Sequence, residues 1–137
     1  MLSDPSVRVL GHRNDVAELM RNSDTLTLPS VEEGFGLVCT EAMGSGCVPL
    51  VSDACTDVCQ HMDNALVHRV GDVEALARHI TLLSRDRMLL QRLRTAGLKE
   101  RNSLTWGAAG VRLLEAYRET IQMYSQKKGA QRGASGN

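Results

Sequence analysis

Short apolar runs along the chain alternate with longer segments in which apolar residues recur at helical spacing. Thr25 to Leu28 and Val48 to Val51 are rich in leucine and β-branched residues, which is typical of buried strands. The segment between these runs has glycines at both ends and the length of a helix that begins at about Leu37. The pattern therefore predicts a strand, a tight turn, a helix and a second strand.

Two further apolar runs predict additional strands, at Val7 to Leu10 and at Ala65 to Val70. Helical segments separate the predicted strands, and parallel neighbouring strands need such crossover connections. The alternation therefore predicts an α/β fold with about four parallel strands, flanking helices and a helical C-terminal part.

The remaining helices are predicted from capping residues and apolar spacing. Asp15 begins a helix that extends to about Arg21, and Glu18 three residues later resembles a capping box. Further helices are expected from Asp72, over Arg87 to Arg101, and after Thr105, which can cap the last one. In the helix after Asp72, five apolar residues recur with helical period and predict one buried face: Val73, Leu76, Ala77, Ile80 and Leu83.

The last predicted helix has an apolar stripe of residues three or four positions apart: Trp106, Gly110, Leu113, Tyr117, Ile121 and Tyr124. Such a stripe needs a covering surface, so we expect self-association or a partner protein there. Residues 127–137 are mostly Gly, Ser, Gln, Ala and basic residues, a composition typical of disorder. The sequence thus predicts a folded domain at 1–126 and a disordered tail at 127–137.

Composition excludes several classes of partner. The chain has 137 residues, 42% hydrophobic and 23% charged, and its 16 basic and 16 acidic residues cancel. Because no basic stripe interleaves with aromatic residues, nucleic acid and anionic membrane surfaces are poor candidates. No apolar run approaches the roughly 18 residues of a membrane span, and the N-terminus lacks a secretory pattern. We therefore expect a cytoplasmic protein with no transmembrane segment, whose ligand is a small molecule or another protein.

The four cysteines do not have the spacing of a zinc site: Cys39, Cys47, Cys55 and Cys59. Only Cys55, Cys59 and His61 form a cluster that could be considered as metal ligands. Free cysteines behave as small hydrophobic residues, and disulfides are rare in the expected compartment. We expect free thiols and no metal site.

The turn before the central helix has the chemistry of an anion site. Gly34 and Gly36 can adopt positive φ and let backbone approach a ligand. The first N–H groups of a helix have no intrahelical partners, and the helix dipole favours negative charge there. Glu33 and Glu41 bracket the turn and would be about 12 Å apart along a helix. Carboxylates accept hydrogen bonds from hydroxyls, so the pair could bind two ends of one polyhydroxylated phosphate ligand.

This stretch resembles glycosyltransferase family four, the group 1 nucleotide-sugar glycosyltransferases of GT-B fold. The similarity rests on Glu33-Gly34-Phe35-Gly36-Leu37, on Glu41-Ala42-Met43 and on Gly46 to Val51. The segments before and after this motif are also similar to the family, so the resemblance covers roughly residues 7–122. By resemblance, the chain would be part of the Rossmann-like C-terminal domain that binds the donor, without the N-terminal acceptor domain.

The resemblance implies retaining transfer of a sugar from a nucleoside diphosphate sugar to an acceptor hydroxyl. It makes Glu33 the catalytic residue, a ligand for donor-sugar hydroxyls, and Glu41 the ligand for ribose hydroxyls. The other donor-binding residues that it implies lie around the turn: Gly34, Phe35, Gly36, Leu37 and Val38. It implies no metal and no cofactor besides the donor substrate. Because half of the cleft would be absent, we expect this chain to be inactive without the acceptor domain or subunit.

Other interpretations of the same residues stay open. Glu33 and Glu41 could be ordinary solvated carboxylates, and Phe35 is more typical of a buried anchor than of a stacking surface. A second hypothesis is a non-catalytic binding or assembly module that acts through its exposed surface or its C-terminal helix. A third is another phosphate-binding α/β domain, because a glycine turn before a helix is common.

Overall fold

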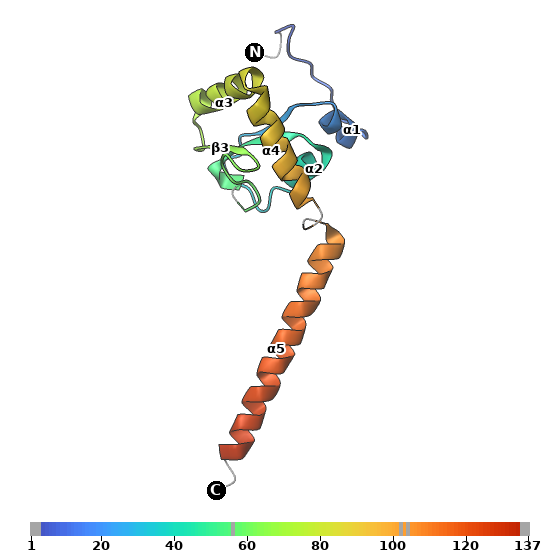
Figure 1. The fold of residues 1–137 in the computed structure, drawn as a ribbon, viewed down its shortest axis with the longest axis vertical. Coiled ribbons are helices and arrows are strands. Elements are labelled where there is room, and N and C mark those ends of the chain that lie inside the picture. Colours follow the sequence, from blue (N-terminus) through green and yellow to red (C-terminus); the bar gives the residue numbers. More distant parts are fainter. Residues whose placement is uncertain (1–3, 56, 102, 104, 135–137) are drawn as a thin grey trace. The chain divides into compact units, whose positions relative to one another are not determined.

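The computed structural model describes residues 4–55, 57–101, 103 and 105–134 (Figure 1). The chain forms two compact units, Met1–Arg101 and Asn102–Asn137. This division follows Arg101, whereas the sequence places the domain boundary after residue 126. Each unit is described below by itself.

The first unit is built on a parallel sheet of three strands, in the order β1-β2-β3. These strands are β1 (Thr25–Leu28), β2 (Val48–Ser52) and β3 (Leu66–His68). The central strand β2 is buried along its whole length, as expected for a strand with neighbours on both edges and helices on both faces. The structure confirms the predicted α/β class with a parallel sheet.

The sheet has three strands where the sequence predicts about four, because the strand predicted at Val7 to Leu10 does not form. Residues 7–10 form no strand, and the side chains of Val7, Val9 and Leu10 are 45%, 71% and 47% exposed. Among the described residues β1 pairs only with β2, so the apolar run at 7–10 has no ladder to join. A short β-branched run without a pairing partner does not form a strand.

Helices occupy the segments between the strands and the C-terminal part. Their bounds are α1 (Val16–Arg21), α2 (Leu37–Ser45), the 3-10 helix η1 (Asp53–Cys55), α3 (Val73–Arg85), α4 (Arg87–Glu100) and α5 (Trp106–Ala134). Three of these helices are capped at their N-terminus by a side chain. The Asp72 and Asp86 carboxylates accept hydrogen bonds from backbone N–H groups of α3 and α4, and the Thr105 hydroxyl caps α5, as predicted.

The capping box predicted at Asp15 does not form. Asp15 precedes α1, but its side chain makes no capping hydrogen bond. The Arg13 guanidinium binds both oxygens of this carboxylate instead. A charged bidentate partner competes successfully with the backbone N–H groups for the same acceptor.

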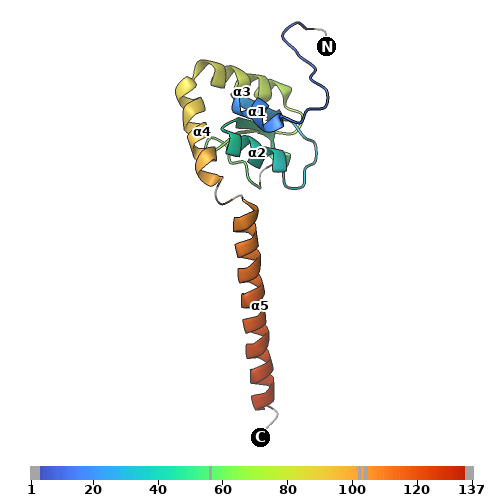
Figure 2. The ribbon, with the colours of Figure 1, turned by 90° about the vertical axis from the view of Figure 1, so that its right-hand side faces the viewer.

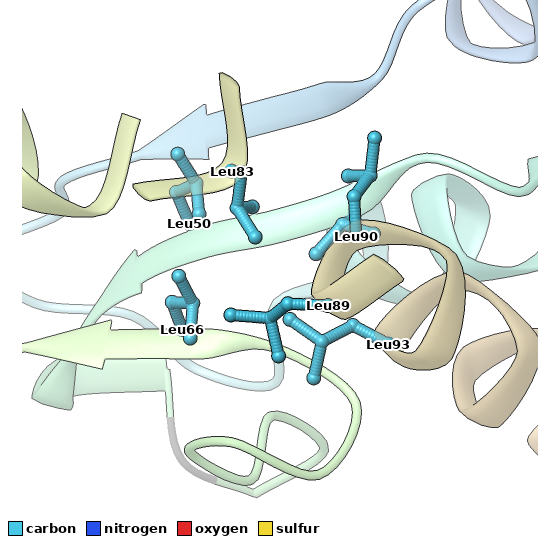
Figure 3. Close-up of a cluster of buried hydrophobic side chains, with 7 residues drawn as sticks. Leu50, Leu66, Leu83, Leu89, Leu90 and Leu93 are labelled. Carbon is cyan, nitrogen blue, oxygen red and sulfur yellow. The ribbon is translucent and has the colours of Figure 1, made fainter. Parts of the chain in front are cut away.

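Two apolar clusters hold the helices on the sheet. The larger one joins β2 and β3 to α3 and α4 (Figure 3), and it contains Val48, Leu50, Leu66, Leu83, Leu89, Leu90 and Leu93. The smaller one joins α1 and α2, which lie next to each other in Figure 2, through Met20, Ala42 and Cys47. The sheet thus has a core on both faces, as a parallel sheet requires.

The buried face predicted for α3 is only partly correct. Leu83 is buried and Leu76 packs against the larger cluster, but Val73 is 75% exposed and Ile80 is 48% exposed. The sheet is narrow and β3 has only three residues. It therefore offers too little surface to cover the whole apolar stripe of the helix.

The second unit consists mainly of α5, a helix of 29 residues. It continues to Ala134 and so includes most of the segment that the sequence predicts to be disordered, whereas residues 135–137 lie outside the described part. Lys, Gln, Ala and Arg in this segment favour a helix, whereas Gly129 and Gly133 do not. No helix in the described residues has both the length and the apolar character needed to cross a membrane.

Candidate functional site: the glycine turn at the start of α2

The turn between β1 and α2 ends at Gly36, whose backbone is left-handed with φ 69° and ψ 48°. A β-carbon at this position would lie 3.5 Å from the Cys39 sulfur, an ordinary contact. The conformation, rather than lack of space, is therefore what requires glycine here. Gly34, two residues earlier, does not have a positive φ, and no atom would lie within 4 Å of a β-carbon added there. The geometry at Gly34 would therefore accept a side chain.

The first turn of α2 leaves hydrogen-bond donors free. The Cys39 N–H donates to the Gly36 carbonyl at 2.8 Å. Within the described residues no hydrogen bond uses the N–H groups of Leu37 and Val38. These groups carry the positive end of a nine-residue helix dipole. The helix start is therefore able to bind an anion.

The structure holds the side chain of Glu33 beside this helix start. Glu33 is half-buried, and the Ser30 hydroxyl donates to its Oε2 atom at 3.4 Å. The Ser52 hydroxyl, at the end of β2, donates to the Ser30 carbonyl at 2.6 Å. Ser52 is itself fully buried. A chain of two serines thus connects the centre of the sheet to the predicted catalytic carboxylate.

Glu41, the second predicted carboxylate, has a different environment. It lies on α2 and is exposed, and no described side chain donates a hydrogen bond to it. The structure therefore brings Glu33 into a hydrogen-bonded position and leaves Glu41 free. Whether both bind one ligand stays a prediction.

Two predicted apolar residues of the turn do not contribute to the core. Phe35 is 49% exposed and Leu37 is 55% exposed, so the interpretation of Phe35 as a buried anchor is wrong. Val38 is half-buried and packs against the smaller apolar cluster. Phe35 and Leu37 extend from a loop at the edge of the sheet, where no further described element covers them.

Three buried thiols meet beneath the turn, a feature that cysteine spacing alone does not predict. Cys39, Cys55 and Cys59 are at most 3% exposed, and all are free, as expected. A hydrogen bond with Cys59 lowers the pKa of Cys39, whereas burial raises the pKa of Cys55. The charge of Glu33 acts in the opposite direction on Cys39 and raises its pKa. Within the described residues no group of side chains could hold a metal ion.

Three histidines form a second cluster, which the sequence does not predict. The rings of His61 and His68 lie 5.6 Å and 6.0 Å from the His79 ring, centre to centre. The buried Nδ1 atoms of His68 and His79 have no hydrogen-bond partner among the described residues. Burial, followed by the neighbouring His61 and His68, lowers the pKa of His79. His79 is half-buried, because α3 turns it toward His68 at the end of β3.

Two hollows of the first unit lie outside the turn. One, of about 580 Å³, is lined by Asp63 and α4 residues, among them Arg92 and Lys99. The other, of about 400 Å³, lies on α3. Neither includes a predicted donor-binding residue.

The sequence of this chain matches a known family over most of the first unit. Residues 3–100 match the glycosyl transferases group 1 family. A relative from Campylobacter jejuni, N,N'-diacetylbacillosaminyl-diphospho-undecaprenol alpha-1,3-N-acetylgalactosaminyltransferase, is 33% identical over 90 residues. The matched region is 64% of this chain and 24% of the relative. The chain therefore spans about a quarter of that enzyme's length.

Solved structures share the fold. Anabaena HepE, determined in complex with UDP, has a TM-score of 0.73 and 23% identity, covering 84% of this chain and 32% of that one. The C-terminal domain of a glycosyl transferase group 1 family protein from Francisella tularensis has a TM-score of 0.64 and 21% identity. This second match covers 72% of the present chain and 51% of the domain.

Proposed function

The chain belongs to the group 1 glycosyl transferases, and we propose that it is the donor-binding part of such an enzyme, within glycosyltransferase family four. Its reaction is retaining transfer of a sugar from a nucleoside diphosphate sugar to an acceptor hydroxyl. The chain corresponds to part of the C-terminal domain, and an acceptor domain or subunit completes the cleft. The region that matches the Campylobacter relative is 24% of that enzyme, so the similarity concerns only one part of it.

One observation carries the proposal: a left-handed glycine, two free N–H groups and a held carboxylate converge at the start of α2. The N–H groups of Leu37 and Val38 bind the diphosphate. Glu33 accepts hydrogen bonds from the donor sugar, and Glu41 accepts them from the ribose. The remaining turn residues shape the loop around the ligand: Gly34, Phe35 and Gly36.

The chemistry explains why this part needs a second one. Departure of a diphosphate leaving group develops negative charge, which fixed N–H donors and a helix dipole stabilise. Holding donor and acceptor in reactive geometry supplies a further ~7–11 kcal/mol of the barrier. One edge of a sheet cannot hold both substrates. We therefore expect donor binding by this chain and transfer only in the presence of the acceptor domain.

Amide chemical shifts test donor binding directly. The ¹⁵N-labelled chain is titrated with UDP-N-acetylglucosamine and with GDP-mannose at millimolar concentration. We expect shifts concentrated at residues 33–42, and a weaker affinity in Glu33→Gln. Glu32→Gln is the matched control, because Glu32 is the exposed neighbour with the same charge. Absence of shifts at residues 33–42 with both donors would refute the proposal.

A second candidate function rests on α5. Its apolar side chains are open to solvent within their own unit, with Leu113 54% and Tyr117 58% exposed. An uncovered stripe of this length is typical of an interaction surface. The chain could therefore associate with a partner through α5, independently of any ligand bound at the turn. Sedimentation of Leu113→Glu tests this: a complex that dissociates with the variant, but not with Glu33→Gln, favours assembly. A monomeric wild-type chain excludes self-assembly through α5.

A further inference from the structure

We infer that Ser30 and Ser52 are positioning residues that fix the Glu33 carboxylate for the donor. The inference deepens the proposed function and rests on it. In the sequence both serines are only polar residues near strand ends, whereas the structure connects them into one chain of hydrogen bonds that ends on Glu33.

The connection begins at the buried central strand of the sheet. Ser52 is the last residue of β2, the central strand, and is 0% exposed. Its hydroxyl donates to the Ser30 carbonyl at 2.6 Å and so ties the loop after β1 to the neighbouring strand. The backbone of Ser30 is therefore fixed by a contact that does not involve the turn itself.

The Ser30 hydroxyl then orients the carboxylate. It donates to the Glu33 Oε2 atom at 3.4 Å, three residues along the chain. A hydroxyl has one proton to donate. The Cys55 sulfur also lies within hydrogen-bonding reach of both serine hydroxyls, and burial raises the pKa of the Cys55 thiol. A carboxylate is a stronger acceptor than a thiol, so the Ser30 proton is directed to Glu33.

In this arrangement one carboxylate oxygen of Glu33, Oε2, accepts the hydrogen bond from Ser30. The other oxygen is available to a ligand. Restricting a long side chain before binding removes part of the entropy that binding would otherwise lose. Glu41, which no described side chain holds, lacks this restriction. Glu33 is therefore pre-oriented by the protein, whereas Glu41 becomes ordered only when a ligand binds.

Side-chain dynamics test the inference without any ligand. Methylene relaxation of the chain with labelled glutamate reports the order of the Glu33 Cγ group, and exposed Glu32 is an internal reference. We expect Glu33 to be more ordered than Glu32 in the wild type. The difference should disappear in Ser30→Ala, decrease in Ser52→Ala and persist in Ser30→Thr, which keeps the hydroxyl.

A double-mutant cycle tests the link to binding. In titrations with UDP-N-acetylglucosamine and GDP-mannose, Ser30→Ala should weaken donor binding roughly three- to tenfold, the effect expected of one lost hydrogen bond. In the Glu33→Ala background the same substitution should have no effect, because Ser30 acts through Glu33. The matched control is Ser84→Ala, which removes a serine hydroxyl that bonds only a helix carbonyl. Urea unfolding verifies that every variant folds.

Each result has a distinct meaning. Unchanged Glu33 order in Ser30→Ala overturns the inference, and so do additive effects of Ser30→Ala and Glu33→Ala. The inference is supported if the Glu33 side chain loses its order in Ser30→Ala and keeps it in Ser30→Thr. It also requires that the effects of Ser30→Ala and Glu33→Ala on donor binding are coupled in the cycle. If the order changes as expected but no form of the chain binds either donor, the positioning of Glu33 stands and the proposed donor-binding function fails.

Discussion

Replacing Gly36 with alanine tests whether the turn depends on its left-handed conformation. Gly36 has φ 69°, and an L-residue in this region is disfavoured by about 1–2 kcal/mol. The added β-carbon would lie 3.5 Å from the Cys39 sulfur and 3.8 Å from the Glu33 Cγ atom. Both distances are ordinary contacts, so overpacking adds little. We therefore expect Gly36→Ala to lower the free energy of unfolding by about 1–2 kcal/mol.

Two companion variants isolate the backbone effect. Asparagine tolerates the left-handed region better than alanine, so Gly36→Asn should cost less than Gly36→Ala. At Gly34 φ is not in the left-handed range and no atom lies within 4 Å of an added β-carbon. Gly34→Ala should therefore be neutral or stabilise by up to ~1 kcal/mol, because it restricts the unfolded chain.

Urea unfolding, followed by far-UV circular dichroism, measures these differences. With a slope of about 1–3 kcal/mol/M, a loss of ~1.5 kcal/mol lowers the midpoint by roughly 0.5–1.5 M. Equal midpoints for Gly36→Ala and Gly34→Ala would refute the reasoning, because the two positions would then not differ in backbone conformation. A larger loss in Gly36→Asn than in Gly36→Ala would point to steric crowding instead.

Three further predictions concern stability. Leu93 is fully buried in the larger apolar cluster, so Leu93→Ala should cost about 2–5 kcal/mol in urea unfolding. The pKa of His79 is lowered in the folded chain, so its contribution to stability is present above pH 6.5 and is lost as pH falls below that value. Thermal midpoints measured between pH 7.5 and 5 should therefore decrease, and His79→Gln should reduce this decrease. Gly44 lies on α2 with nothing within 4 Å of an added β-carbon. Gly44→Ala should therefore increase the free energy of unfolding by about 0.5–1 kcal/mol, which urea unfolding would show as a higher midpoint.

The elements around the turn could be predicted from the sequence because several local signals agree. The strands before and after the turn, the helix start at Leu37 and the α4 helix all lie where apolar runs, spacing and glycines place them. Each of these elements is determined by residues within its own segment. Consistency between local preference and global fold is what makes such predictions reliable.

Most of the features that differ from the predictions depend on contacts between distant parts of the chain. The run at 7–10 has strand composition but no pairing partner among the described residues. The Asp15 carboxylate is a local exception, because it binds Arg13, two residues away, and not the helix N–H groups. The exposure of Phe35 follows from the open edge of a small sheet. Likewise, the hydrogen bond from Ser52 to Ser30 joins positions 22 residues apart. Residue spacing in one sequence contains no record of such contacts.

The affinity of the chain for UDP relative to uridine tests the central claim most directly. The two ligands differ only by the diphosphate, which the free N–H groups at the start of α2 are proposed to bind. Calorimetric titration should show UDP binding at least about tenfold more tightly, with the largest amide shifts at Gly36, Leu37 and Val38. Equal affinity for UDP and uridine, or shifts that avoid these three residues, would contradict a diphosphate site at this turn.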